Sequence, residues 1–199
     1  MDVLAINGSP RGDRGVTAHV LAPFLEGMRE GGARVELLRT CELDIGPCLG
    51  CRRCWTETGG VCVQRDDMQE VYPRLSRADV LVLATPVFFD GMTGPMKNLL
   101  DRCVALVHPR IEVRGGRQRH PPKAPGAGGH RRQVALVSVC GFHEMATFAP
   151  LVAHVRAVAE NMDRDYAGAV LRPHGWVLAE MRETLQRLGP LTWREGAAQ

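Results

Sequence analysis

The stretch that decides the fold is Ala78-Asp79-Val80-Leu81-Val82-Leu83-Ala84, which the pair Thr85-Pro86 ends. A strand with one solvated face alternates apolar and polar residues, whereas this run is apolar at nearly every position. Strands of this kind are buried on both faces, as in a parallel sheet. The run therefore predicts an internal strand of an α/β domain.

Other segments along the chain predict the rest of that sheet and its helices. Apolar or alternating runs predict strands at residues 3–6, 34–38, 134–139 and 166–171. Apolar residues at helical spacing predict helices over residues 18–28, 66–75, 93–103, 148–162 and 176–188. Asp66 is the predicted N-cap of the second helix, with Gln69 three residues on, and Thr93 is the predicted cap of the third. Alternating strands and helices indicate a parallel sheet covered on both faces.

Length and composition set the class of protein. A chain of 199 residues predicts one domain, residues 1–199, with ordinary hydrophobic and charged fractions of 45% and 24%. The net charge of +3 is too small to indicate nucleic acid, and no apolar run approaches the ~18 residues that span a bilayer. The N-terminus has no signal-peptide pattern. Seven cysteines, an odd number, favour a reducing cytoplasm over a disulfide framework.

A loop rich in Gly, Ser and Arg follows the first strand and precedes a helix. It reads Asn7-Gly8-Ser9-Pro10-Arg11-Gly12-Asp13-Arg14-Gly15-Val16-Thr17. This arrangement presents backbone N–H groups and a helix N-terminus to a phosphate, with Ser9, Thr17 and the arginines as further donors. The spacing matches neither a Walker A loop nor Gly-x-Gly-x-x-Gly. Phosphate binding and a plain polar turn are both open interpretations of this loop.

Two further polar loops follow strands of the same sheet. After Pro86 come Phe88, Phe89 and Met92 among glycines, which could form a wall for a flat ring; taken alone, burial of both aromatics in the core is slightly favoured. After Val139 come Cys140-Gly141-Phe142-His143-Glu144. His143 and Glu144 could protonate an acceptor, but a structural role is the favoured interpretation. An open α/β sheet binds ligands at the carboxyl ends of its strands, where these loops meet.

Two irregular segments interrupt the pattern. The cysteine-rich loop 41–65 contains Cys48, Cys51, Cys54 and Cys62, whose close spacing favours an iron–sulfur cluster over zinc; thiols without a metal are the third possibility. The segment 108–133 is basic and rich in Pro and Gly, and we interpret it as a surface loop. It could cover a phosphorylated cofactor or reach another subunit. Without interleaved aromatics it does not predict nucleic-acid binding.

Several of these segments together resemble a known family. They are Asn7-Gly8-Ser9-Pro10-Arg11, Pro47-Cys48-Leu49-Gly50-Cys51-Arg52-Arg53-Cys54 with Cys62, Asp66-Asp67-Met68, Ala84-Thr85-Pro86-Val87-Phe88-Phe89, Met92-Thr93-Gly94, Met96-Lys97 and Asp101-Arg102. In order and spacing the chain resembles the flavodoxin-like NAD(P)H-dependent FMN reductases and iron–sulfur flavoproteins. The match covers residues 2–105 well and residues 139–142 more loosely.

The resemblance implies a doubly wound, five-stranded flavodoxin-like sheet that binds FMN. It implies a cofactor site formed by Ser9, Arg11, Gly15, Val16, Thr17, Thr85, Pro86, Val87, Phe88, Phe89, Gly91, Met92, Cys140, Gly141 and Phe142. Of these, Ser9, Arg11 and Thr17 are expected to hold the phosphate. The isoalloxazine ring is expected to be lined by Pro86, Val87, Phe88, Phe89 and Gly91, with Gly141 and Phe142 closing its far side. In cluster-bearing members the compact cysteines carry a [4Fe–4S] centre near the flavin. Here the gap between Cys54 and Cys62 is long for such members.

The implied activity is FMN-dependent electron transfer from NAD(P)H or a reduced carrier to a flavin, quinone or similar acceptor. The partners are then a nicotinamide nucleotide and a redox acceptor, with neither nucleic acid nor membrane, and a homodimer or homotetramer is expected. One alternative is a flavin and iron–sulfur electron carrier without turnover, although such carriers are usually more acidic than this chain. A structural zinc protein is the other alternative.

Overall fold

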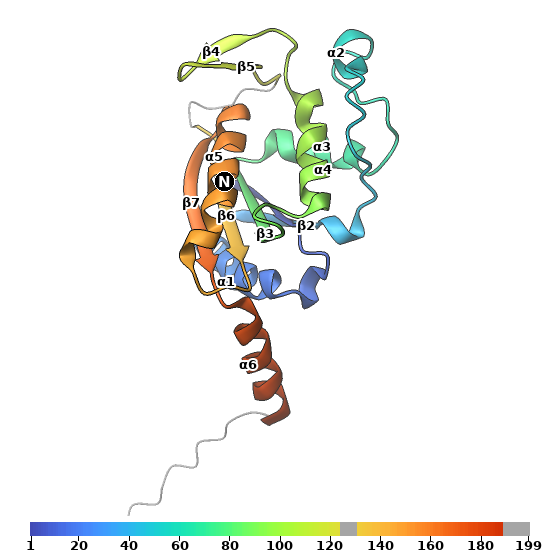
Figure 1. Ribbon diagram of the computed structural model, residues 1–199. Coiled ribbons are helices and arrows are strands. Elements are labelled where there is room, and N and C mark those ends of the chain that lie inside the picture. The colour runs from blue at the N-terminus through green and yellow to red at the C-terminus, as the bar shows by residue number, and fades with distance from the viewer. Residues whose placement is uncertain (124–130, 189–199) are drawn as a thin grey trace, which may run out of the picture.

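The computed structural model describes residues 1–123 and 131–188. Its centre is a parallel sheet in the order β2-β1-β3-β6-β7 (Figure 1). The strands are β1 (Asp2–Asn7), β2 (Arg34–Arg39), β3 (Val80–Pro86), β6 (Gln133–Val139) and β7 (Asp165–Arg172). The predicted internal strand is β3, which pairs with β1 on one side and β6 on the other. This strand order confirms the flavodoxin-like, doubly wound α/β fold.

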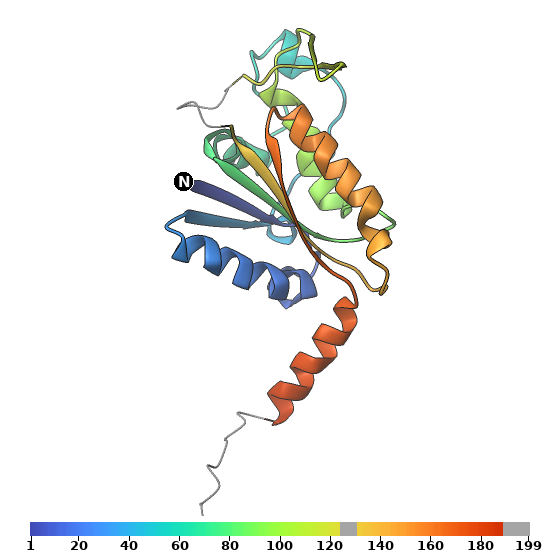
Figure 2. The same cartoon turned by 90° about the vertical axis from the view of Figure 1, so that its left-hand side faces the viewer.

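Helices cover both faces of the sheet (Figure 2). They are α1 (Val16–Glu30), α2 (Arg53–Thr56), α3 (Met68–Arg77), α4 (Gly94–Arg102), α5 (Ala149–Asn161) and α6 (Gly175–Leu188). Single 3₁₀ turns lie at Gly12–Arg14, Thr40–Glu42, Cys103–Leu106 and Met145–Phe148. In the described ranges, no helix combines the length and apolar character that a membrane span requires.

The apolar strands supply one core on each face of the sheet. Alternate residues of a strand point to opposite faces. Leu81 and Leu83 of β3 therefore face the core formed with α3, α4 and α5, which includes Leu4, Met96 and Val155. Val80 and Val82 face the other core, whose members from α1 are Leu21 and Leu25. The absence of alternation in residues 80–84 thus follows from burial on both sides.

The last strand and helix are less covered than the others. Strand β7 lies at the sheet edge and has no fully buried residue; Val170 is 40% exposed. Helix α6 extends away from the sheet instead of lying along it (Figures 1 and 2). Its described side chains include Trp176 and Met181, which are 53% and 56% exposed. Part of the sheet beside α1 therefore has no helix over it in the described chain.

The basic segment 108–133 contains a hairpin that the sequence did not predict. Strands β4 (Glu112–Arg114) and β5 (Arg117–Arg119) pair antiparallel through Gly115 and Gly116, which both have positive φ. Residues 124–130 of this segment lie outside the described chain. The hairpin is tied to the end of α5 by Arg114–Asp163 (2.6 Å) and Arg119–Glu160 (3.1 Å). Its arginines therefore have acidic partners within the same chain.

The prediction that Asp66 caps the second helix as part of a capping box was wrong. Helix α3 begins at Met68, and Gln69 Nε2 donates to Gln64 O instead of reaching back to residue 66. Asp66 Oδ1 does accept from Met68 N (3.1 Å), but its carboxylate is chiefly paired with Arg102. The residues next to Asp66 suggested a helix cap. They could not indicate that its partner is Arg102, 36 positions further along the chain.

Candidate functional site

A cavity of about 360 Å³ opens at the carboxyl edge of the sheet, which we call the carboxyl-edge cavity. It is lined by Ser9, Pro10, Arg11, Gly15, Val16, Thr17, Pro86, Val87, Phe88, Val139, Cys140, Gly141, Gly175, Trp176 and Glu180. The loops after β1, β3 and β6 thus meet at one place, as the sheet topology predicts. The start of α6 completes the wall. Among the residues expected to bind cofactor, Thr85, Phe89, Gly91, Met92 and Phe142 lie outside this lining.

The loop after β1 is shaped by a residue that sequence reasoning missed. Asn7 is fully buried; its Oδ1 accepts from Ser9 N (3.0 Å) and its Nδ2 donates to Gly12 O (3.3 Å). Ser9 Oγ accepts from Arg11 N (3.3 Å). These bonds fold the loop over the end of β1 and deliver its backbone to the N-terminus of α1. An Asn between a strand and a glycine was the available signal, since Asn stabilises such turns.

The N-terminus of α1 is built closely against this loop. Gly15 precedes the helix, and a Cβ added there would lie less than 3.0 Å from Ser9 Oγ. No side chain caps the helix, so its first N–H groups face the cavity region with the positive end of the helix dipole. Arg11 lines the cavity and adds positive charge to it, and the cavity also contains one carboxylate, that of Glu180. The donor set fits a phosphate.

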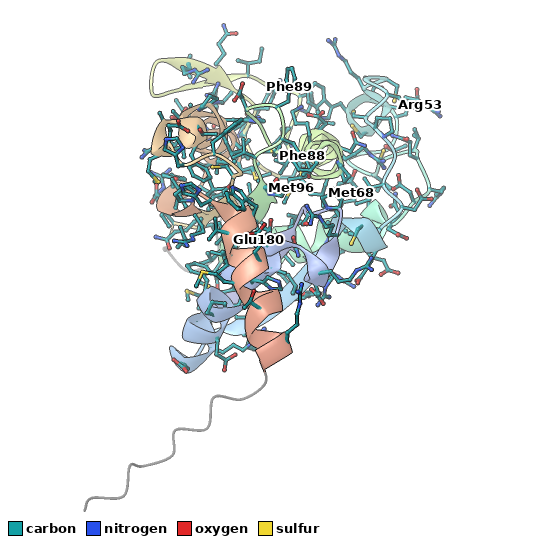
Figure 3. The ribbon with its side chains drawn as sticks, turned by 60° about the horizontal axis from the view of Figure 1, so that its bottom comes forward. Arg53, Met68, Phe88, Phe89, Met96 and Glu180 are labelled. Carbon is teal, nitrogen blue, oxygen red and sulfur yellow. The ribbon has the colours of Figure 1, made fainter. Side chains whose placement is uncertain are left out.

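The loop after β3, which carries the labelled Phe88 and Phe89 in Figure 3, makes a tight turn. Phe88 and Gly91 exchange two backbone hydrogen bonds, of 2.9 and 3.0 Å, across Phe89 and Asp90, which have φ of +49° and +64°. Positive φ is strained for a bulky residue such as Phe. Phe88 is 51% exposed and Phe89 106% exposed, so the alternative that both are core residues was wrong. Phe88 forms a wall of the cavity, while Phe89 points into solvent.

The residues behind this turn are structural. Thr85 is buried; its Oγ1 donates to Pro86 O (2.9 Å) and accepts from Thr93 N (3.2 Å). Met92 is buried in the core with α4. Thr93 precedes α4 as predicted, and its hydroxyl donates to Gly8 O (2.7 Å). The loops after β1 and β3 are therefore joined directly.

The loop after β6 meets α6 at the far side of the cavity. Gly175 N donates to Cys140 O (2.8 Å), and Trp176 Nε1 donates to Gly141 O (3.1 Å). Burial raises the pKa of the Cys140 thiol, whose Sγ donates to Phe142 O (3.3 Å). The position of α6 in the site was missed, because helical periodicity does not say which surface a helix end approaches.

His143 lies beside the carboxyl-edge cavity but does not line it. Its Nε2 pairs with Glu144 (3.1 Å), and its ring stacks on His174 with centroids 5.5 Å apart. Both His143 and Glu144 are solvent-exposed. His143 and Glu144 therefore form a pair on the protein surface, outside the lining of the carboxyl-edge cavity.

The four clustered cysteines line a second cavity of about 510 Å³, which we call the cysteine cavity. Its walls also include Arg102, Val104, Ala105, Trp55 and His120. Gly50 and Arg52 have positive φ, which lets the loop curl between Cys48 and Cys54 before the single turn of α2. The pKa of Cys54 is raised, first by burial and then by Cys62, while Lys123 opposes the shift. The four thiols therefore line the cavity together with two arginines, Arg52 and Arg102, and Lys123 adds a third positive charge nearby.

The donor set of the cysteine cavity, four thiols, suits an iron–sulfur cluster by its chemistry. A tetrahedral zinc site places four ligands about 2.0–2.3 Å from one ion. Within residues 1–123 and 131–188, no three His, Cys, Asp or Glu side chains are grouped to hold a single ion. A [4Fe–4S] centre distributes four thiolates over separate irons and therefore needs a wider arrangement. Four sulfurs around one roomy cavity have that character.

The two cavities lie at opposite ends of α4. Thr93, at the start of this helix, contacts the loop after β1, whereas Arg102 at its end lines the cysteine cavity. They have no lining residue in common. The resemblance implied a cluster near the flavin; within a single chain the nine residues of α4 lie between the cysteine cavity and the carboxyl-edge cavity.

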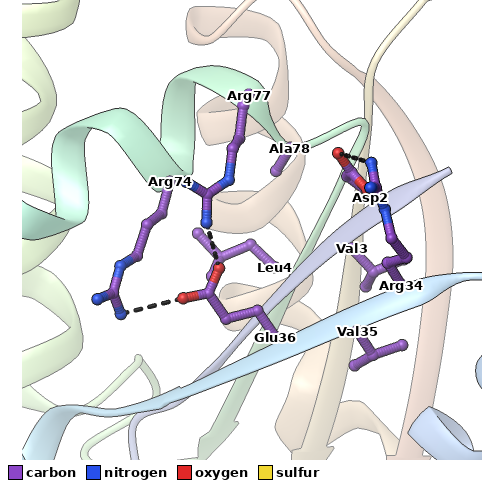
Figure 4. Close-up of a pocket in the computed structure, with 9 residues that line it drawn as sticks. All are labelled: Asp2, Val3, Leu4, Arg34, Val35, Glu36, Arg74, Arg77 and Ala78. Atoms are coloured by element: carbon purple, nitrogen blue, oxygen red, sulfur yellow. Dashed lines mark hydrogen bonds and ion pairs between the residues drawn. The ribbon is translucent and has the colours of Figure 1, made fainter.

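A third cavity, of about 390 Å³, lies at the amino ends of β1 and β2 (Figure 4). It is lined by ion pairs, including Asp2–Arg34 (2.6 Å), Glu36–Arg77 (2.7 Å) and Glu36–Arg74 (3.1 Å). The charges that line it satisfy one another. It is also at the edge of the sheet opposite to the one at which open α/β sheets bind ligands. We do not assign it to function.

The five-stranded parallel sheet with helices on both faces defines the class of protein, a flavodoxin-like α/β protein with a cavity at the carboxyl edge of its sheet. The chain belongs to the NADPH-dependent FMN reductase family, whose model matches residues 1–159. Membership makes it a flavin-dependent oxidoreductase.

Individual relatives agree with this assignment. The chain is 31% identical over 192 residues to an iron–sulfur flavoprotein of Methanocaldococcus jannaschii, covering 94% of each chain. In structure it is similar to an FMN-dependent NADH-azoreductase from Bacillus anthracis in complex with FMN, with a TM-score of 0.62, 16% identity and coverage of 95% and 99%. It is also similar to an NAD(P)H:quinone oxidoreductase from Methanothermobacter marburgensis, with a TM-score of 0.62, 15% identity and coverage of 92% and 94%. The last two likenesses concern the fold.

Proposed function

We propose that the protein binds FMN in the carboxyl-edge cavity and transfers electrons from NAD(P)H or a reduced carrier to a small acceptor such as a flavin or quinone. We further propose that Cys48, Cys51, Cys54 and Cys62 hold a [4Fe–4S] cluster. The observation that carries the proposal is the meeting of the loops after β1, β3 and β6 in one cavity at the carboxyl edge of the sheet. The name of the Methanocaldococcus relative supports the cluster.

Different residues of the carboxyl-edge cavity bind the phosphate and the ring of FMN. Arg11, Ser9 and the N-terminus of α1 hold the phosphate, because they supply positive charge and N–H donors on one side of the cavity. Pro86, Val87 and Phe88 form an apolar wall for the ring, and Gly141 with Trp176 forms the opposite wall. When bound, FMN supplies hydride and single-electron chemistry. The chain's part is to orient the ring and to leave one side of it open to a donor or acceptor.

The cysteine cavity needs no acid–base side chain. Its role is to present four thiolates with positive charge nearby, from Arg102 and Lys123. A cluster there supplies one-electron transfer. The same cations compensate the negative charge of four coordinating thiolates.

The deciding experiment uses anaerobically purified protein. We expect flavin absorbance with additional broad absorbance near ~400 nm, and about four irons and four sulfides per chain as a four-cysteine cluster requires. Rapid mixing with NADH and with NADPH, followed by a flavin or quinone acceptor, tests turnover. Flavin that neither nucleotide reduces, but that a reduced ferredoxin reduces, would favour the electron-carrier alternative. Colourless protein with bound zinc would contradict the proposal.

A matched pair of cysteine variants separates the two cofactors. Cys51→Ala should lose iron and the broad absorbance and keep FMN, since Cys51 lines only the cysteine cavity. Cys41→Ala is the control, because Cys41 is an exposed cysteine before the cluster of four and lines neither cavity. Equal iron content in the Cys51→Ala and Cys41→Ala variants would contradict the assignment of Cys51 as a cluster ligand.

A further inference from the structure

Arg102 is the most deeply buried charged residue near the cysteine cavity. Its side chain has no exposed surface, and it lies at the last position of α4. A buried guanidinium is costly unless its N–H groups find acceptors. Where those N–H groups point therefore indicates what the residue does.

The Arg102 side chain forms a clamp at the base of the cysteine-rich loop. Its Nη1 donates to Asp66 Oδ2 (2.6 Å) and to Gly46 O (3.0 Å), and its Nη2 donates to Asp66 Oδ1 (3.1 Å). Asp66 also accepts from Gly46 N (3.2 Å). Gly46 lies two residues before Cys48, and Asp66 lies four residues after Cys62. The ion pair thus ties together the two arms of the loop that carries all four cysteines.

The remaining contact of Arg102 reaches a cysteine. Its Nη2 also donates to Cys62 Sγ (3.4 Å). Cys62 is separated from the other three cysteines by the Gly59-Gly60 bend, so its sequence neighbourhood does not fix it beside them. Arg102 Nε is buried and has no acceptor in the described part of the chain. A thiolate that accepts a hydrogen bond from a buried cation is both held in place and electrostatically stabilised.

We propose that Arg102 is a positioning residue for the cysteine cavity: with Asp66 it closes the base of the loop, and through Nη2 it orients Cys62 and raises the reduction potential of the cluster held there. This inference rests on the proposed function for the cluster, whereas the clamp itself does not. Hydrogen bonds to ligand sulfurs and nearby positive charge both favour the more negative, reduced state of a cluster. Loss of the Cys62 contact should therefore lower the potential.

Two variants test the inference. Arg102→Lys keeps the charge and can still reach Asp66, but an ammonium cannot donate to Asp66, Gly46 and Cys62 in the fork that a guanidinium provides. Arg102→Met combined with Asp66→Asn removes both charges, so no carboxylate is left buried without its partner. Arg53→Met is the matched control. Arg53, labelled in Figure 3, is an exposed arginine between Cys51 and Cys54, and it pairs with Glu57 (2.7 Å).

The first measurement is hydrogen exchange on metal-free protein, which is independent of any cluster. We expect faster exchange at residues 44–48 and 66–68 in Arg102→Lys than in wild type, because Asp66 then holds Gly46 N and Met68 N less firmly. Arg53→Met should exchange as wild type does. Unchanged exchange in Arg102→Lys would overturn the clamp.

The second measurement is a redox titration of the reconstituted protein followed by electron paramagnetic resonance. We expect a more negative midpoint potential in Arg102→Lys and a larger shift or loss of iron in the double variant, with FMN content unchanged. Equal potentials in wild type, Arg102→Lys and the control would overturn the role toward Cys62. If the double variant does not fold, the midpoint potential of Arg102→Lys alone tests the role of Arg102 toward Cys62. Wild-type protein that binds FMN but no iron would refute the proposed cluster, and the exchange result would still decide the clamp.

Discussion

At the scale of single residues, Gly15 lies where the loop after β1 passes closest to the start of α1. Its backbone has φ of −81°, which any residue can adopt, so the need for glycine there is one of space. A Cβ would collide with Ser9 Oγ, itself part of the proposed phosphate site. The collision can be relieved only by moving the Ser9 side chain or the loop that carries it.

Gly15→Ala should therefore weaken FMN binding while leaving the protein folded. We expect a loss of about tenfold or more, which corresponds to about 1.4 kcal/mol, in a titration of apoprotein followed by flavin fluorescence. Gly27→Ala is the control: Gly27 lies within α1 with nothing within 4 Å of an added Cβ. That variant should gain about 0.5–1 kcal/mol in stability and bind FMN as wild type does. Equal affinity in both variants would contradict this role for Gly15.

Single residues also show which features of the site the sequence could predict and which it could not. Ser9 and Arg11 were expected in the site because a Gly/Ser loop after a strand is a local pattern. Asp66 was misread as a capping-box residue, since its partner Arg102 lies 36 positions further along the chain. For Phe88 and Phe89, predicted from the resemblance to bind cofactor, the residues taken alone slightly favoured the core, whereas a turn with two positive φ values exposes both. Contacts between distant residues and unusual backbone angles have no local signature.

At the scale of elements, hydrophobic periodicity was sufficient to predict the strands of the main sheet and most of the helices. Periods of two and 3.6 residues depend only on which face of an element is buried. The β4–β5 hairpin was not predicted, because its charged residues show no apolar alternation. Helix α6 was predicted to exist, but its contribution to the carboxyl-edge cavity was not. Periodicity identifies elements and does not place their ends.

The placement of α6 predicts a spectroscopic signature of flavin binding. Trp176, the second residue of α6, lines the carboxyl-edge cavity, whereas Trp55 lines the cysteine cavity and donates to Val104 O (2.9 Å). Bound FMN should quench tryptophan emission, and Trp176→Phe should lose most of that quenching because, of the two tryptophans in the described chain, Trp176 is the one that lines this cavity. Trp55→Phe should retain it. Equal quenching in the two variants would place α6 away from the flavin.

At the scale of the whole molecule, one side of the sheet is incomplete. Helix α1 covers the face beside β1 and β3, but α6 leaves the body instead of covering β7 (Figure 2). Exposed apolar side chains occur on both: Val170 on β7, and Trp176 and Met181 on α6. Grouped apolar exposure on a folded protein marks an association surface. A second copy of the chain can supply the missing cover, which agrees with the expected homodimer or homotetramer.

We therefore predict that the protein sediments as two or four chains of 21.8 kDa, and that charge placed on this surface separates them. Val170→Lys and Met181→Lys each change a side chain that is 40% or 56% exposed in the single chain, so each should cost little stability there. Both should shift the mass measured by light scattering toward one chain, because an unpaired ammonium would be buried in the assembly. The control is Val113→Lys on the β4–β5 hairpin, where the side chain is 70% exposed. This hairpin is tied to Asp163, before the amino end of β7, whereas Val170 and α6 lie at the carboxyl end of that strand. A wild-type mass of one chain with full FMN content, or an assembly that both surface variants leave intact, would show that the open face of β7 is not where copies meet.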